Sequence, residues 1–199
     1  RGTAFVESDK LGGYDPYSAS KATCEIVIDS YRNSFFNLQD FNVHKKSIAS
    51  VRAGNVIGGG DFSKDRIIPD IVRSIQNHTA INLRNPNATR PWQHVLDPLS
   101  GYLLLGMNLL QKKNVSEGWN FGPSVDSNCS VERLVKIAKQ VWPLISSSNG
   151  TDSNQVHEAH LLMLDCSKAS KILNWVPIWD LQQSVFHTIE WYSNWHVKQ

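Results

Sequence analysis

The stretch Tyr17-Ser18-Ala19-Ser20-Lys21 places a phenol and an ammonium group four residues apart near the start of the chain. Apolar residues continue the pattern at helical spacing, at Ala22, Ile26, Val27 and Tyr31. Because positions i and i+4 of a helix lie on one face, the side chains of Tyr17 and Lys21 can share one small volume. A free tyrosine titrates near pKa ~10, and a neighbouring cation favours its phenolate. The stretch therefore predicts a helix that carries an acid/base pair.

The residues on both sides extend the prediction to a loop, a helix and a strand. Pro16 suits the first turn of a helix, and Asp15 is a suitable N-terminal cap. The helix is predicted to continue to about Phe36. The run Ser47-Ile48-Ala49-Ser50-Val51 then indicates a short buried strand, which Arg52-Ala53-Gly54-Asn55-Val56-Ile57-Gly58 follows.

These segments in this order resemble the extended short-chain dehydrogenase/reductase family, from about Glu7 to Tyr192. Within that family the chain is similar to CDP-glucose 4,6-dehydratases in four separated blocks, Gly12–Ser18, Arg52–Asp61, Thr89–Val95 and His157–Leu161. The resemblance implies an α/β fold. Residues 1–60 would form the last part of an NAD(P)-binding Rossmann fold, and residues 61–199 mainly a small α/β domain that binds the sugar nucleotide.

The same resemblance implies an NAD-dependent lyase that dehydrates CDP-glucose to CDP-4-keto-6-deoxyglucose, in deoxysugar and O-antigen biosynthesis. Tyr17 would take the proton of the sugar 4-hydroxyl while hydride leaves C4 for NAD, and Lys21 would keep Tyr17 acidic and bind the nicotinamide ribose. Arg52 is also assigned to the cofactor. Two alternatives stay open: a nucleotide-sugar 4-epimerase that uses the same Tyr17 and Lys21, and a fragment that binds a nucleotide sugar without catalysis.

Five substrate-binding residues are implied by the resemblance: Asn55, Arg66, Arg90, Glu158 and His160. Arginine suits a diphosphate because its planar guanidinium donates paired hydrogen bonds to oxyanions, and Arg90 is the first candidate for this role. Glu158 and His160 are assigned to the base or ribose. From the residues alone, a surface salt bridge is the better interpretation of each arginine, and Asn55 equally fits a hydrogen bond to its own loop.

Two further motifs suggest other sites, but their spacing argues against both. His157 and His160 stand at i and i+3, whereas helical zinc motifs hold histidines at i and i+4, so we predict no metal site. Gly58-Gly59-Gly60-Asp61 follows a strand, but Phe62-Ser63-Lys64-Asp65 separates it from the next helix. A phosphate loop needs its helix to begin at once, so we predict a flexible turn.

No G-x-G-x-x-G or G-x-x-G-x-x-G motif precedes the Tyr17 helix. In the resembled family that glycine-rich unit comes first, together with the Ser or Thr that joins the Tyr-Lys pair and the acid that acts at C6. We therefore expect the C-terminal part of a longer enzyme, in which these 199 residues hold only part of the cofactor site.

Composition and charge exclude several classes of function. The chain has 41% hydrophobic residues, enough for a core, and a net charge of +2 without a basic block, so nucleic acid is not predicted as a partner. No apolar run reaches membrane-spanning length. Cys24, Cys129 and Cys166 are odd in number and far apart, which favours reduced thiols in the cytoplasm. By resemblance, the partner is a second copy that packs through the Y-x-x-x-K helix.

The remaining sequence alternates between helical and strand patterns. Further helices are predicted to start near Arg66, at Asp97-Pro98, at Ser130, and after caps at Asp165 and Asp180. Strands are predicted at Ile81-Asn82-Leu83-Arg84 and from Gly118 to Phe121. The polar run from Ser146 to Ser153 predicts an exposed loop, and His94 is interpreted as a packed or hydrogen-bonded loop residue rather than a catalyst.

Overall fold

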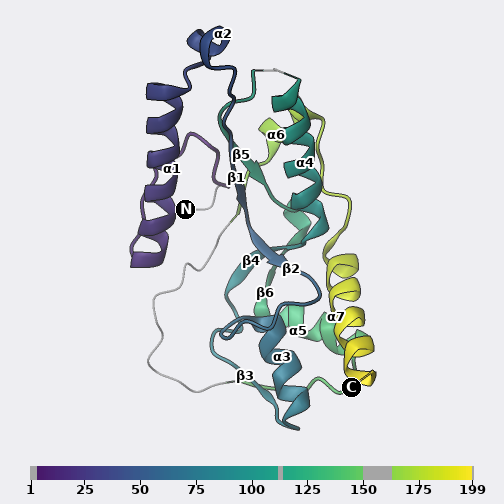
Figure 1. Cartoon of the computed structure of the whole chain (residues 1–199). Coiled ribbons are helices and arrows are strands. Elements are labelled where there is room, and N and C mark those ends of the chain that lie inside the picture. The colour runs from purple at the N-terminus through teal and green to yellow at the C-terminus, as the bar shows by residue number, and fades with distance from the viewer. Residues whose placement is uncertain (1–3, 112–113, 150–162, 199) are drawn as a thin grey trace.

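A computed structural model describes residues 4–111, 114–149 and 163–198 of the chain (Figure 1). Its α-helices are α1 (Pro16–Phe35), α2 (Phe41–His44), α3 (Ile67–Gln76), α4 (Leu96–Leu110), α5 (Val131–Val141), α6 (Ser167–Leu173) and α7 (Leu181–Val197). Its strands are β1 (Ser50–Ala53), β2 (Asn55–Ile57), β3 (Ile81–Leu83), β4 (Thr89–His94), β5 (Gly118–Phe121), β6 (Asn128–Ser130) and β7 (Ser147–Asn149). Short 3-10 turns cover η1 (Leu38–Asp40) and η2 (Val125–Ser127). Within the described ranges, no helix is long and apolar enough to cross a membrane.

The strands form three small sheets. β1 pairs in parallel with β5, β3 pairs in parallel with β7, and β4 lies between β2, which is parallel to it, and β6, which is antiparallel. In Figure 1, α1 and α4 stand on opposite sides of the β1–β5 pair, and α3, α5 and α7 gather around the other strands. We call the set β2, β3, β4, β6, β7, α3, α5 and α7 the pocket module.

Helix α1 begins where the sequence predicts, at Pro16. The carboxylate of Asp15 accepts a hydrogen bond from the Ser18 backbone N–H at 3.0 Å, which satisfies one of the free donors at the helix start. Only Ala22 of its 20 residues is buried. The helix therefore attaches to the rest of the chain with little apolar packing.

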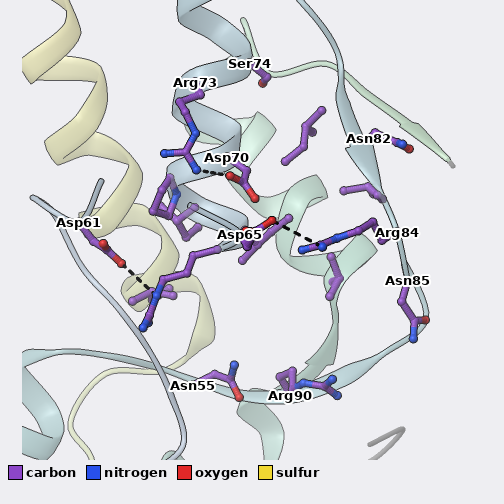
Figure 2. Close-up of a pocket in the computed structure, with 18 of the residues that line it drawn as sticks. Asn55, Asp61, Asp65, Asp70, Arg73, Ser74, Asn82, Arg84, Asn85 and Arg90 are labelled. Atoms are coloured by element: carbon purple, nitrogen blue, oxygen red, sulfur yellow. Dashed lines mark hydrogen bonds and ion pairs between the residues drawn. The ribbon is translucent and has the colours of Figure 1, made fainter. Parts of the chain in front are cut away.

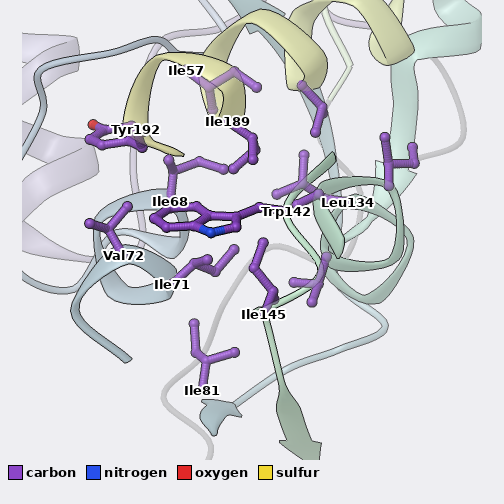
Figure 3. Packing of buried hydrophobic residues seen from close by; sticks show 14 of the residues in the cluster. Ile57, Ile68, Ile71, Val72, Ile81, Leu134, Trp142, Ile145, Ile189 and Tyr192 are labelled. Carbon is purple, nitrogen blue, oxygen red and sulfur yellow. The ribbon is translucent and has the colours of Figure 1, made fainter. Parts of the chain in front are cut away.

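The pocket module has a continuous apolar core, shown in Figure 3. Trp142 lies at its centre among isoleucine and leucine side chains of α3, α5 and α7, and Ile71, Leu134 and Ile189 have no exposed surface. A capping box at Asp180, predicted as a cap, starts α7: its side chain accepts from the Gln183 N–H, and the Gln183 side chain accepts in return. The core thus fixes α3 and α7 around the strands.

A single residue, Gly54, connects β1 to β2. A Cβ atom on Gly54 would lie 2.9 Å from the Pro91 ring on β4, closer than side chains pack, so this position requires glycine. The close approach joins the β1–β5 pair directly to the pocket module.

Four strands were not predicted, and the start of a fifth was misplaced. The run from Ser146 to Ser153 was expected to be a loop, but β7 forms inside it and pairs with β3, beginning with a 2.9 Å hydrogen bond from the Ile81 N–H to the Ser146 carbonyl. Backbone groups make this pairing, and the buried side chains of the pair, Ile81 and Leu83, come from β3. The serine side chains of β7 therefore give no hydrophobic pattern from which a strand could be predicted. The strand expected at Ser47 begins at Ser50, and β2, β4 and β6 were not predicted.

Candidate functional site

The predicted acid/base pair lies on the open surface of α1. The Lys21 Nζ atom is 5.4 Å from the centre of the Tyr17 ring, as i and i+4 spacing requires. Tyr17 is 70% exposed, so its hydroxyl is accessible to a substrate. The structure therefore brings the phenol and the ammonium together as the sequence predicted.

A network of polar contacts ties α1 to β1. One Glu25 carboxylate oxygen accepts hydrogen bonds from Ser50 Oγ at 2.9 Å and from Arg52 Nη2 at 2.8 Å. Arg52 also donates to the backbone carbonyl of Glu7 at 3.1 Å. Burial raises the pKa of Glu25, but the hydrogen bonds from Arg52 and Ser50 and the charges of Arg52 and Arg32 outweigh it, so the pKa lies below its ordinary value. Arg52, predicted at the cofactor, thus holds the Tyr17 helix on its strand in this structure.

A pocket of about 540 Å³ opens in the pocket module (Figure 2). Three predicted substrate residues line it: Asn55 at the start of β2, Arg66 at the N-cap of α3, and Arg90 on β4. Figure 2 shows Asn55 and Arg90 side by side at one edge, where parallel pairing of β2 with β4 places them. Residues 35 positions apart in sequence thus face one cavity.

Two more arginines, which the sequence interpretation missed as site residues, line the same pocket. Arg73 lies on α3, and Arg84 follows β3 directly. An available signal was the position of Arg84 at the end of a predicted strand, where parallel sheets commonly place ligand-binding side chains. Four guanidinium groups around one cavity make it suited to a ligand that carries several oxyanions.

Aspartates face three of these arginines, as the dashed lines in Figure 2 show. Asp61 lies 3.9 Å from Arg66, Asp65 lies 3.6 Å from Arg84, and Asp70 pairs with Arg73. The Arg66 and Arg84 side chains are about two-thirds exposed (64% and 65%), so these ion pairs contribute little to stability, and an anionic ligand can compete for the arginines.

The glycine turn at residues 58–60 is held by α7. The Tyr192 hydroxyl donates to the Asp61 carbonyl at 2.6 Å, and a Cβ atom on Gly59 would overlap the Trp191 indole. This segment makes a turn, as predicted, and its close packing on Trp191 requires glycine. The pocket wall that carries Asp61 and Arg66 is therefore anchored to the apolar core.

His94, the histidine of the block Thr89–Val95, is a packed residue, as predicted. His94 is buried at the end of β4, and its ring lies 4.5 Å, centre to centre, from that of Trp179. Burial and the charge of His187 lower its pKa, so the neutral imidazole is favoured. It lies in a strand instead of the expected loop.

The remaining predicted site residues fall elsewhere. Tyr17, Lys21 and Arg52 do not line the pocket, and Glu158 and His160 lie outside the described residues. In the part of the chain that the structure describes, no group of three or more His, Cys, Asp and Glu side chains is placed to hold a metal ion. The site residues thus stay a prediction, which the pocket supports for Asn55, Arg66 and Arg90.

Comparison with known proteins places the chain in a family. A model of the GDP-mannose 4,6-dehydratase family matches residues 1–188. The chain belongs to this family. It is 47% identical over 192 residues to the CDP-glucose 4,6-dehydratase of Salmonella typhimurium, which covers 96% of this chain and 54% of that protein. It is 24% identical over 202 residues to the human dTDP-D-glucose 4,6-dehydratase, covering 96% of this chain and 52% of that protein.

Solved structures share the fold of this chain. A UDP-glucuronic acid 4-epimerase from Bacillus cereus has a TM-score of 0.81 at 18% identity, over 98% of this chain and 58% of that one. A dTDP-glucose 4,6-dehydratase from Bacillus anthracis has a TM-score of 0.75 at 18% identity, over 98% and 57%. The predicted α/β fold of the extended short-chain dehydrogenase/reductase type is confirmed. This member of the GDP-mannose 4,6-dehydratase family spans about half the length of the curated relatives that it matches.

Proposed function

We propose that this chain forms the catalytic-helix and substrate-binding part of an NAD-dependent CDP-glucose 4,6-dehydratase, a hydro-lyase. The observation that carries the proposal is the 47% identity to the Salmonella typhimurium enzyme across 96% of the chain. The pocket supports it, since four arginines surround a cavity large enough for a nucleotide sugar. Division into residues 1–60 and 61–199 remains part of the proposal.

The proposed chemistry uses the exposed pair on α1. Tyr17 Oη accepts the proton of the sugar 4-hydroxyl, and the Nζ atom of Lys21 lies 5.4 Å from the centre of the Tyr17 ring. NAD, when bound, supplies a reversible acceptor for the hydride that leaves C4 and later returns to C6. Lys21 donors and the Tyr17 hydroxyl are exposed and suited to hold the nicotinamide ribose. Water is lost across C5 and C6 after the hydride has left C4 and before it returns to C6.

The proposed binding of substrate uses the pocket. Arg66, Arg84 and Arg90 bind the diphosphate, and Arg66 and Arg84 exchange their aspartate partners for phosphate oxygens. Asn55, next to Arg90, hydrogen-bonds the sugar nucleotide. Glu158 and His160 are proposed at the base or ribose on the grounds of resemblance alone.

Two parts of the proposal concern assembly and location. A homodimer through α1 is supported by the exposed apolar side chains of that helix. Their exposed fractions are 48–64%, for Ile26, Val27, Tyr31 and Phe35. The cytoplasm is proposed as the location because three widely spaced cysteines favour reduced thiols.

The test is turnover of CDP-glucose with NAD, followed by the alkaline absorbance of the 4-keto-6-deoxy product. It is run on this chain and on the longest natural protein that contains it. We expect Tyr17→Phe to lower kcat by about 10²- to 10⁴-fold, and Tyr31→Phe on the same helix to leave it unchanged. Conversion of CDP-glucose to its 4-epimer without dehydration would replace the proposal by the epimerase alternative. Binding without turnover in both forms would favour the non-catalytic alternative.

A further inference from the structure

Helix α1 carries the proposed catalytic pair, yet apolar packing hardly fixes its position. Of its residues only Ala22 is buried, while Ile26, Val27 and Tyr31 are about half exposed or more. An amphipathic helix is normally held by an apolar face, so within one copy of this chain mainly polar contacts set how α1 is rotated on the sheet.

Glu25 supplies that constraint together with Arg32, whose Nε atom donates to the Ile48 carbonyl at 3.1 Å. Glu25 follows Lys21 by four residues, as Lys21 follows Tyr17, so the three side chains lie on successive turns of one side of the helix. The Glu25 carboxylate is 17% exposed and binds two side chains of β1, Ser50 and Arg52, through one oxygen. Charge-assisted hydrogen bonds of this kind are short and directional, so they fix rotation about the helix axis better than a few methyl contacts do.

Arg52, the partner of Glu25, lies close in sequence to a residue of the pocket. Arg52 stands three residues before Asn55, and only Gly54 separates β1 from β2. Arg52 also donates to the Glu7 carbonyl, and the Glu7 carboxylate accepts from the Asn120 N–H of β5 at 2.9 Å. The Glu25–Arg52 pair thus links α1, the helix of Tyr17, to β1. β1 continues through Gly54 into β2, whose first residue, Asn55, lines the pocket.

We propose that Glu25 is a positioning residue, which with Arg52 fixes Tyr17 and Lys21 relative to the nucleotide-sugar pocket. The inference rests on the proposed function. The reaction requires the Tyr17 hydroxyl at a sugar whose diphosphate is held in the pocket module. A displacement of about 1 Å at such a centre costs about 100-fold in rate. The carboxylate itself touches no substrate and acts through the helix.

The test compares Glu25→Ala, Glu25→Gln and Arg52→Lys in the form of the protein that turns over CDP-glucose. Asp29→Asn is the matched control, because Asp29 is an acid of the same helix, 62% exposed, whose side chain contacts Arg32 and Asn33 of α1 itself. We expect Glu25→Ala to lower kcat about 100-fold with the KM for CDP-glucose within about twofold. Glu25→Gln keeps the shape and one acceptor, so it restores part of kcat, and Asp29→Asn leaves kcat unchanged.

Hydrogen exchange of the same variants separates the possible outcomes. Faster exchange confined to residues 16–35, with the pocket module protected as in the wild type, supports local positioning and shows that the variant has folded. A wild-type kcat in Glu25→Ala, or kcat and KM that worsen together with faster exchange throughout the pocket module, would overturn the proposal while leaving the proposed function intact. Absence of turnover in the wild type would remove the proposed function and this inference with it.

Discussion

Helix α1 and the pocket module are built on opposite principles. The helix that carries Tyr17 and Lys21 buries a single alanine and is held by ion pairs and hydrogen bonds. The pocket module surrounds Trp142 with fully buried side chains such as Ile71 and Ile189. The difference separates two tasks, since binding needs a rigid cavity and the chemical step needs an accessible pair at a defined angle. Polar contacts set such an angle without covering the reacting groups.

The largest expected effect lies in the pocket module. Ile71→Ala removes most of a side chain that has no exposed surface, so we expect it to lower the free energy of unfolding by about 2–5 kcal/mol. Val27→Ala on α1, where the side chain is 48% exposed, should change it by less than about 0.5 kcal/mol. Urea unfolding of both variants measures the contrast. Equal losses would show that α1 is packed as firmly as the core.

A smaller effect is expected where α7 supports the pocket wall. Gly59→Ala forces the Trp191 indole to move, which should cost about 1–3 kcal/mol of unfolding free energy and weaken nucleotide-sugar binding. Gly106→Ala in α4 is the control, because nothing lies within 4 Å of its added Cβ and alanine favours helix, so this variant should gain up to about 1 kcal/mol. Thermal unfolding and a binding titration measure both. A neutral Gly59→Ala would mean that the wall is not anchored by Trp191.

Much of the fold was predictable from local signals. Asp15 and Pro16 fixed the start of α1, and Asp180 with Gln183 fixed that of α7, because a helix cap is decided within four residues. The strand β7 could not be predicted, since its serines pair through backbone groups with a segment more than 60 residues away. Short strands whose burial comes from their neighbours leave no periodic pattern.

The candidate site divides in the same way. The Tyr17–Lys21 contact follows from helical spacing, and resemblance pointed to the three residues that meet in the pocket, Asn55, Arg66 and Arg90. Arg84 and the Glu25–Arg52 pair were missed, because the pair depends on which strand α1 packs against and the role of Arg84 depends on the cavity that the folded elements enclose. A charge on a predicted helix usually faces water, so Glu25 gave no sign that its partner lies 27 residues further on.

Acid should loosen α1 before it loosens the pocket module. The pKa of Glu25 is lower in the folded chain than in the unfolded chain, where it is about 4.5. The ionised Glu25 side chain therefore stabilises the fold fully at pH values above the unfolded pKa, and this stabilisation is lost as the pH falls through the folded pKa. Hydrogen exchange of residues 16–35 corrected for intrinsic rates, measured from pH 6 downward, should therefore lose protection first. In Glu25→Gln this loss should be smaller, and the part that remains belongs to the Asp15 cap, whose pKa is lowered by its hydrogen bonds with Ser18. Simultaneous loss of protection in α1 and α5 would contradict the two-region description.

The smallest perturbation of the folded core is a thiol label applied to the native protein. Cys24 lies exposed on α1, whereas burial raises the pKa of both Cys129 and Cys166 to about 11. At pH 8 only about one in a thousand of these two thiols is ionised, and the thiolate is the reactive form. Ellman's reagent should therefore modify one thiol rapidly and the other two slowly, and Cys24→Ser should remove the fast phase. Because α1 is also the proposed dimer helix, slow labelling of Cys24 that quickens on dilution would show that a second copy covers it. The open face of α1 would then belong to the isolated chain and not to the assembled protein.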